Sequence, residues 1–424
     1  MLENKFDVIV AGGGLSGVAA AIAAARENAK VLIIEQYGFL GGMATAGLVN
    51  PFMSYSLWTG RWEYDWSKKI NQGIFSQIIE QLRDLGGLHD NHQTFNEELL
   101  KLVLDRLIKH FNIRVLFHSH VIDAQRENDR ISSVTVFNKS GKSQYFAKVF
   151  VDATGDADLS AVAECEYNIG RDKDHQCQPM TLCFRLADVD RSKYEGEKNK
   201  LEINKVYEKF HKKGLIKNPR ENVLMFEHMV KSVVHFNSTR IIGKNPVSAE
   251  DLSDAEMEAR EQVFELYNFM KEHIPGFENS KILMSAPKTG VRESRRIIGE
   301  YTITEHDLLS ATKFDDSIAR GTYPVDIHNP SGSGTMLKDI PYGDYYTIPY
   351  RALVPKGIDN LIVAGRPISS THEAHSAYRI MPICTCIGEA AGIAAFLSIA
   401  NNTTFRDVDY KKLQSLLRKY NALY

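Results

Sequence analysis

A glycine-rich turn near the start of the chain constrains its fold more than any other feature. The run FDVIVA (6–11) is short, apolar and rich in β-branched residues, as expected of a strand buried on both faces. Gly12, Gly14 and Gly17 follow in the spacing G-x-G-x-x-G, and a helical segment of small residues begins directly after them. A second buried strand, KVLIIE (30–35), completes a βαβ unit that predicts a dinucleotide-binding fold.

Each part of this unit has a physical role in holding a dinucleotide. The first glycine permits a tight turn, the second lets the backbone approach a diphosphate, and the third lets helix and strand pack closely. The start of the helix offers free N–H groups and its positive dipole end to the phosphates. Glu35, at the end of the second strand, is placed to accept both hydroxyls of a ribose and to repel a 2′-phosphate. These features leave NAD and FAD open.

Segments farther along the chain favour FAD over NAD. Gly41-Gly42-Met43-Ala44-Thr45 has a thin backbone that could run along the diphosphate and flavin of an extended FAD. VDATGD (151–156) is a strand that enters a tight turn, and NLIVAGRPIS (360–369) is a strand that ends at a glycine. A helix expected to begin near Met381 would direct the positive end of its dipole at the cofactor. An NAD dehydrogenase is therefore disfavoured.

These segments, together with GVRESRRIIGEY (290–301), YPVDIH (323–328) and IPYRALVP (348–355), resemble the FAD-dependent oxidoreductases with a glutathione-reductase-type cofactor domain. The resemblance covers nearly the whole chain and is strongest to a bacterial branch that is distantly similar to fumarate reductase and aspartate oxidase flavoproteins. It implies an α/β fold: a Rossmann-type FAD-binding domain, with a parallel sheet, helices and a small β layer, plus an inserted α+β substrate domain.

The resemblance also implies which residues contact FAD, which we expect to be bound non-covalently, although a histidine or cysteine near the ring could link it. Val121 is expected at the adenine end. The other expected contacts are Gly12, Gly14, Leu15, Ser16, Gly17, Glu35, Gln36, Gly42, Ala44, Thr45, Ala153, Thr154, Gly155, Asp158, Arg366, Met381 and Pro382.

The middle of the chain reads as a separate layer. It is more charged than its flanks and carries a long helix expected to begin near Ser253, with Glu256 in capping-box register. An earlier amphipathic helix is expected to begin near Thr94, with Glu97 in the same register. We therefore predict an FAD-binding domain in two parts, 1–171 and 291–424, and an inserted substrate domain over 172–290.

Candidates for substrate chemistry gather just before the helix expected at Met381. His372 and His375 could serve as a base, and Arg379 could clamp an anion; both histidines could instead be packing residues. The spacing His-x-x-His also suits a metal, but no further ligands stand at matching distances, so no metal is expected.

Two further clusters carry charged residues. The segment Arg292–Arg296 holds three arginines, of which Arg295 could anchor a carboxylate or phosphate. The competing interpretation is a salt-bridged face in which Glu293 pairs with the arginine three residues on. Asp326 and His328 alternate on one strand and so share a face, either as a functional pair or as a structural one.

Trp58, Trp62 and Trp66 could form a lid or a ring-binding wall over the flavin, or a surface loop or subunit interface packed on its own aromatics. Five cysteines without a C-x-x-C motif favour a reducing compartment. Cys384-x-Cys386 could be a redox pair, but its apolar setting favours small hydrophobes.

Composition excludes several classes of protein. The chain has 424 residues, 43% of them hydrophobic, and a net charge of −2 from 51 basic and 53 acidic residues. This balance favours a globular enzyme with no nucleic-acid or membrane partner, and the direct entry into a strand predicts a cytoplasmic location. We expect an FAD-dependent oxidoreductase that transfers a hydride between a small organic substrate and flavin N5. A flavin-dependent transfer-RNA-modifying enzyme and a non-catalytic flavin-binding protein are the alternatives; the electron acceptor and a homo-oligomeric state stay open.

Overall fold

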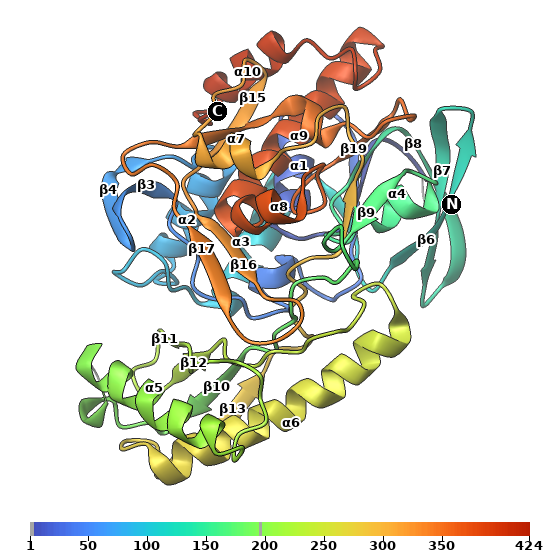
Figure 1. Ribbon diagram of the computed structural model, residues 1–424. Helices are drawn as coiled ribbons and strands as arrows, with labels where there is room; N and C mark the ends of the chain where they lie inside the picture. Colours follow the sequence, from blue (N-terminus) through green and yellow to red (C-terminus); the bar gives the residue numbers. More distant parts are fainter. Residues whose placement is uncertain (1–3, 195–196) are drawn as a thin grey trace.

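A parallel sheet forms the centre of the computed structural model, which describes residues 4–194 and 197–424 (Figure 1). Its strands have the spatial order of a dinucleotide-binding sheet. Because β1, β2 and β8 are parallel, their carboxyl ends lie at the same edge of the sheet. In spatial order the parallel strands are β5 (Arg114–Leu116), β2 (Val31–Ile34), β1 (Lys5–Ala11), β8 (Gly141–Asp152) and β19 (Leu361–Val363). The expected α/β fold is confirmed.

Strand β8 belongs to two layers at once. Its first half pairs antiparallel with β7 (Arg130–Asn138), which in turn pairs with β6 (His120–Glu127), and this meander forms the small β layer. Its second half takes β19 on the same edge instead. The buried Asn360 side chain fills the fork between the two partners: its amide accepts from Ile131 N at 2.8 Å and donates to Ile131 O at 2.8 Å.

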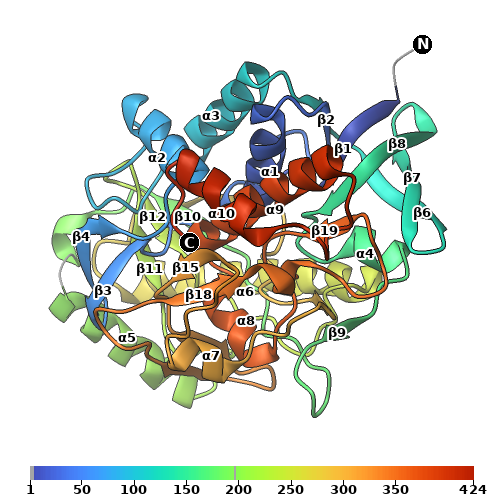
Figure 2. The same ribbon diagram turned by 90° about the horizontal axis from the view of Figure 1, so that it is seen from above.

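Two apolar helices cross at very short range against the sheet (Figure 2). They are α1 (Leu15–Arg26) and α9 (Met381–Asn401), and both are buried along most of their length. A Cβ on Gly388 would lie 2.1 Å from Ser16 O, and one on Gly392 would lie 2.1 Å from Ala20 O. Glycine at these two positions therefore allows the crossing. Helix α9 is long and apolar enough to span a membrane, but 83% of its apolar window is buried inside the molecule, as in a core helix.

A second layer lies below the first and has its own core (Figure 1). Phe184 and Phe236 stack at its centre, with ring centroids 4.6 Å apart. Within the described part of the chain, its antiparallel sheet runs β11 (Met225–Glu227), β12 (Val234–Phe236), β10 (Phe184–Ala187) and β13 (Lys281–Ser285), packed with α5 (Glu197–Lys212) and α6 (Ala249–His273). The domain boundaries at 171 and 290 stay predictions.

Both expected helix starts differ from the structure. Helix α3 (Glu97–His110) is capped by Asn96, whose side chain accepts from two backbone N–H groups, so Thr94 is not the cap. Helix α6 begins four residues before Ser253 because Ser248 caps it. In each case a polar residue nearer the true start satisfies the free N–H groups of the first turn.

Glu97 has a different role, because it joins the two layers. Its carboxylate forms a bidentate ion pair with Arg185 of β10, in which Arg185 Nη2 lies 2.8 Å from Glu97 Oε2. Both side chains are buried. Removing either partner would leave an uncompensated charge, so this pair fixes how the layers meet.

The remaining elements frame the edge of the sheet. The β3–β4 hairpin carries the three tryptophans, and β16–β17 reaches down to the second layer. The bounds are α2 (Ile74–Asp84), β3 (Ser56–Gly60), β4 (Glu63–Lys69), α4 (Asp158–Val162), β9 (Tyr167–Ile169), β14 (Arg295–Ile297), α7 (Glu305–Leu309), β15 (Ser317–Gly321), β16 (Val325–His328), β17 (Thr335–Lys338), β18 (Tyr346–Pro349), α8 (His372–Tyr378), α10 (Tyr410–Lys419), and the 3₁₀ turns η1 (Gly42–Ala44), η2 (Arg191–Lys193) and η3 (Tyr350–Leu353).

His235 makes the stability of the second layer depend on pH. It is 1% exposed, and burial beside Arg185 lowers its pKa to about 3. Below about pH 6.5 this histidine is protonated in the unfolded chain but stays neutral in the folded chain. For this group, the free energy of unfolding therefore decreases by about 1.4 kcal/mol for each unit by which the pH is lowered. His235→Leu should reduce the loss in urea stability between pH 7 and pH 5 by about 2 kcal/mol. The exposed His110→Leu is the control, and equal losses in both variants would contradict the assignment.

Candidate functional site

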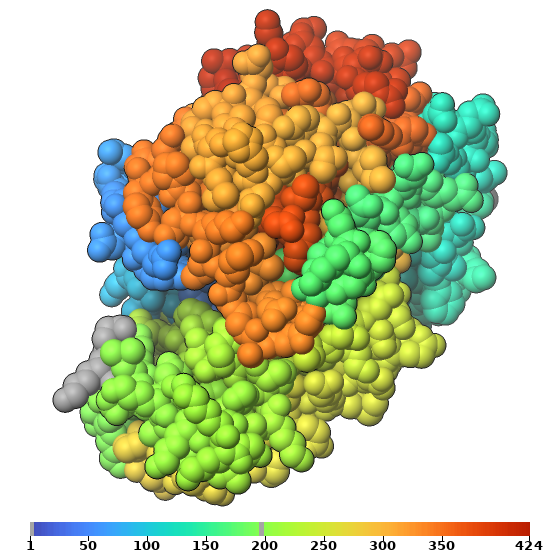
Figure 3. Space-filling view, in the orientation of Figure 1, coloured from blue at the N-terminus to red at the C-terminus, as the bar shows by residue number. Residues whose placement is uncertain are grey.

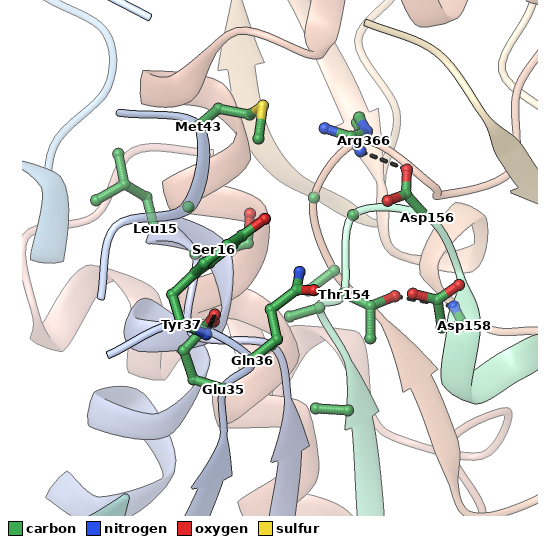
Figure 4. A pocket seen from close by; sticks show the side chains of 18 of the residues that line it. Leu15, Ser16, Glu35, Gln36, Tyr37, Met43, Thr154, Asp156, Asp158 and Arg366 are labelled. Carbon is green, nitrogen blue, oxygen red and sulfur yellow. Dashed lines mark hydrogen bonds and ion pairs between the residues drawn. The ribbon is translucent and has the colours of Figure 1, made fainter. Parts of the chain in front are cut away.

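A pocket opens where the carboxyl ends of β1, β2 and β8 meet the N-termini of α1 and α9 (Figure 4). Most of the expected cofactor residues line it, although they come from four distant parts of the chain. They are Gly12, Gly14, Leu15, Ser16, Glu35, Gln36, Gly42, Val121, Ala153, Thr154, Gly155, Asp158, Arg366 and Met381.

Bare backbone forms the floor of this pocket. Gly12 adopts φ +96°, and a Cβ there would lie 2.4 Å from Ala153 O. A Cβ on Gly42 would lie 2.9 Å from Gly14 Cα, so the second glycine of the motif faces the loop after β2. Within the described chain, no side chain caps the first turn of α1. The free N–H groups of this turn and the narrow glycine cradle suit a diphosphate.

Glu35 lies at the other wall and is 4% exposed. Its Oε2 accepts from Gly13 N at 2.6 Å and its Oε1 from Tyr37 N at 2.8 Å. Burial raises its pKa, which these backbone donors counteract. These two hydrogen bonds hold the side chain in place. Each carboxylate oxygen keeps a second lone pair, so it could still accept a hydrogen bond from a ribose hydroxyl.

Charged groups surround the far end of the pocket. Arg366 Nη2 donates to Asp156 Oδ1 at 2.5 Å (Figure 4). Ser294 Oγ donates to the same oxygen at 2.6 Å. Burial would raise the pKa of Asp156, but the charges of Arg366 and Lys288 hold it below its usual value. Arg366 Nε is buried and has no acceptor among the described residues, so a donor is left at this end of the pocket.

Some expected contacts lie behind the lining rather than on it. Gly17 packs α1 on the strand, since a Cβ there would lie 1.9 Å from Gly12 O. Thr45 Oγ1 donates to Leu40 O at 2.7 Å and so shapes the loop, while Ala44 and Pro382 are buried beside the lining. Their roles at the cofactor stay predictions.

Several lining residues were not predicted from the sequence. Tyr37, Met43 and Asp156 adjoin or fall within motifs of the sequence, so the motifs themselves could have identified them. Lys288 carries no local signal, because it reaches the pocket from the loop after β13 of the second layer.

The expected catalytic residues occupy different positions. Arg379 lines the pocket, whereas Arg295 donates to Asp158 Oδ1 at 2.8 Å and to Asp156 O at 2.9 Å. His372 lies on a second, outer pocket, and its Nδ1 is 2.8 Å from Glu293 Oε1. His375 is fully buried, and neither ring nitrogen has a hydrogen-bond partner among the described residues.

The environment of these residues determines their charge. Burial, with Arg296 and Arg379 nearby, lowers the pKa of His375 well below its usual value, so it is neutral at pH 7. Glu293 also forms a buried ion pair with Arg296, the pairing that the sequence analysis considered for this segment. Over the described residues, no group of three His, Cys, Asp or Glu is placed to hold a metal ion.

The aromatic and cysteine clusters can also be placed. Trp58 is buried in the β3–β4 hairpin and contacts Tyr64 and Tyr323, while Trp62 at the turn is 51% exposed. Cys384 and Cys386 are free buried thiols on α9, and burial raises the pKa of each to about 12. Residues two apart on a helix point away from one another, so this geometry suits packing.

The chain matches the family described as FAD dependent oxidoreductase over residues 7–417, and it belongs to that family. It is an oxidoreductase, and its cofactor is FAD. The glycine cradle, the uncapped start of α1 and the unpaired Arg366 Nε fit this cofactor.

Two solved structures are similar to this chain at low sequence identity. A geranylgeranyl bacteriochlorophyll reductase-like protein from Thermoplasma acidophilum is similar with a TM-score of 0.51 and 14% identity, covering 98% of this chain and 84% of that one. The p-nitrophenol 4-monooxygenase PnpA from Pseudomonas putida DLL-E4 has a TM-score of 0.48 and 10% identity, covering 95% and 83%. No curated protein matches the sequence. At 14% identity, the likeness to the Thermoplasma acidophilum protein shows the fold alone.

Glu35→Gln should weaken FAD binding about 10- to 100-fold, because a neutral amide replaces a charged acceptor that contributes about 1.5–3 kcal/mol. Titration of the apoprotein, followed by quenching of FAD fluorescence, measures the change. The matched control is Glu98→Gln, an exposed residue of α3. Equal affinity in the wild type and Glu35→Gln would remove Glu35 from the cofactor site.

Proposed function

We propose that this oxidoreductase transfers a hydride between a small organic substrate and N5 of its flavin. The observation that carries the proposal is the continuity of the lining, which extends from Glu35 through the glycine cradle to Arg379 and the N-terminus of α9. When bound, FAD supplies the hydride acceptor, and the protein positions and shields it.

The chain's own residues have distinct roles in this proposal. Glu35 would hold the ribose, and the first turn of α1 would hold the diphosphate. Arg366, Lys288 and the uncapped start of α9 supply positive charge at the far end, which favours negative charge there.

Arg379 suits the substrate anchor better than Arg295, because only Arg379 lines the pocket and Arg295 is engaged by Asp158. The base is His372 or His375. The Glu293 carboxylate beside His372 Nδ1 would leave Nε2 free to accept a proton, and His375 is neutral in its buried position.

The alternatives make different demands on the surface. A transfer-RNA substrate needs a basic face, which a net charge of −2 does not favour. A purely structural flavoprotein needs no buried histidine such as His375. We propose a cytoplasmic enzyme with a small-molecule substrate. Its electron acceptor and its homo-oligomeric state are left open.

Anaerobic titration tests the proposed reaction. We expect the visible flavin absorbance of the holoenzyme to bleach with at least one member of a panel of amino acids, hydroxy acids, sugars and amines. Air should restore the colour or leave it bleached, depending on the acceptor. Bulk transfer RNA at low salt should leave the elution profile unchanged. A holoprotein that no donor reduces, yet that shifts with transfer RNA, would favour the nucleic-acid alternative.

Single substitutions identify the base. Replacing the true base with asparagine should slow bleaching by the identified substrate about 10²- to 10⁴-fold, because proton removal then lacks its acceptor. FAD affinity should not change. His372→Asn and His375→Asn are compared by stopped-flow, and each serves as the other's control. Unchanged rates in both variants would contradict a histidine base.

A further inference from the structure

Four arginines gather where the second layer meets the β16–β17 hairpin, and we call them the arginine cluster: Arg220, Arg240, Arg292 and Arg379. The space-filling view shows the loop near residue 330, in orange, against the second layer, in green and yellow (Figure 3). Arg220 is 4% exposed and Arg240 is 1% exposed. Each interacts electrostatically with Asp326 of β16, so they share one environment.

The cluster carries more positive than negative charge. The carboxylates that face it are Asp326, which is buried, and Glu221, whose Oε2 lies 3.4 Å from Arg240 Nη2. His328 lies 3.6 Å from Asp326 but is neutral, because burial beside Arg292 lowers its pKa to about 3. Among the described residues, four cations therefore face two carboxylates. Buried charge of one sign is costly unless an opposite charge compensates it.

The arginines of the cluster repel one another. Burial, together with the charges of Arg379 and Arg220, lowers the pKa of Arg292 to about 9. An arginine normally stays charged far above this range. An anion in the cluster would relieve this repulsion.

Some hydrogen-bond donors of the cluster are free. Arg240 donates through Nη1 to Gly332 O and Gly334 O and through Nη2 to Thr335, so its role is structural. Arg220 donates only through Nε, to Asn222 Oδ1 at 3.1 Å, and its two terminal nitrogens have no acceptor among the described residues. A guanidinium with both terminal nitrogens free has the geometry that binds an oxyanion in bidentate fashion.

Gln178 adds a second, independent observation. It is 1% exposed, and its Oε1 accepts from Arg379 Nη2 at 3.4 Å and from His328 N at 3.3 Å. Its Nε2 is buried and lacks an acceptor in the part of the chain that the structure describes. A buried amide donor of this kind is normally satisfied, so an acceptor belongs beside it.

Arg379 connects the cluster to the cofactor pocket. It lines that pocket, and its Nη2 also lies 3.4 Å from Asp326 O. Tyr323 closes the other side, since its hydroxyl donates to Asp326 Oδ2 at 3.0 Å and its ring meets Trp58 of the aromatic hairpin. A small molecule held by the cluster would therefore lie beside the far end of the pocket.

We propose that Arg220, Arg379 and Gln178 bind an oxyanion, a carboxylate or phosphate, of the substrate. This inference rests on the proposed function and adds the substrate class: a small organic anion. The competing explanation is that the extra charge only offsets negative charge on the reduced flavin, in which case no added anion binds.

The test uses holoenzyme and small anions in place of the unidentified substrate. Acetate, succinate and inorganic phosphate are titrated separately at constant ionic strength set with chloride, and both the flavin difference spectrum and Tm are recorded. We expect at least one of them to perturb the spectrum saturably and to raise Tm, because a ligand that binds the folded state stabilises it. The carboxylates and phosphate distinguish the two oxyanion chemistries.

Variants assign the effect to the cluster. Arg220→Gln should weaken binding of the responding anion at least tenfold. Arg220→Lys keeps the charge but loses the bidentate guanidinium, so it should weaken binding less. Gln178→Met removes the free amide donor and is an independent variant should Arg220→Gln fail to fold. The exposed Arg260→Gln on α6 is the matched control and should bind as the wild type does.

The outcomes separate this inference from the proposed function. The anion site is contradicted if no anion changes the spectrum or the Tm of the wild-type holoenzyme. It is also contradicted if the anions affect Arg220→Gln and the wild type equally. If amines or sugars, which carry no oxyanion, bleach the flavin in that same protein, hydride transfer stands without the anion site. If anions bind but no donor bleaches the flavin, the anion site stands and the proposed reaction fails.

Discussion

The close approach of bare backbone at the start of α1 is the constraint on which the rest of the structure depends. Gly17 rests on Gly12 O and Gly42 rests on Gly14 Cα, at separations that exclude a side chain on Gly17 or Gly42. Because helix, strand and loop meet here without side chains between them, the free N–H groups of α1 lie open to the pocket. Any added side chain would move these elements apart and spread the groups that converge on the cofactor.

The same device is repeated on the other side of α1. Gly388 and Gly392 bring α9 against Ser16 and Ala20, so the last long helix is fixed to the first one. This contact positions Met381 and Arg379, at and just before the start of α9, on the pocket that the first helix also forms. Residues near the end of the chain thus complete a site begun by its first fifteen residues.

Local patterns allowed part of this architecture to be predicted. The βαβ unit was predicted because strand, glycine spacing and helix follow one another directly, and Asp326 and His328 were placed on one face by strand alternation alone. The start of α3 was mistaken because Asn96 competes with Thr94 as the cap. Lys288 and Arg220 carry no local pattern, and they reach their positions only through packing of the second layer.

Strand β8 has a consequence for how the chain is made. Its edge is shared between β7, which directly precedes it in a hairpin, and β19, which arrives more than two hundred residues later in the sequence. During synthesis the second half of that edge therefore stays open until β19 (Leu361–Val363) has left the ribosome. Such an unpaired edge invites association with other chains, so the nascent protein should depend on chaperones until β19 docks.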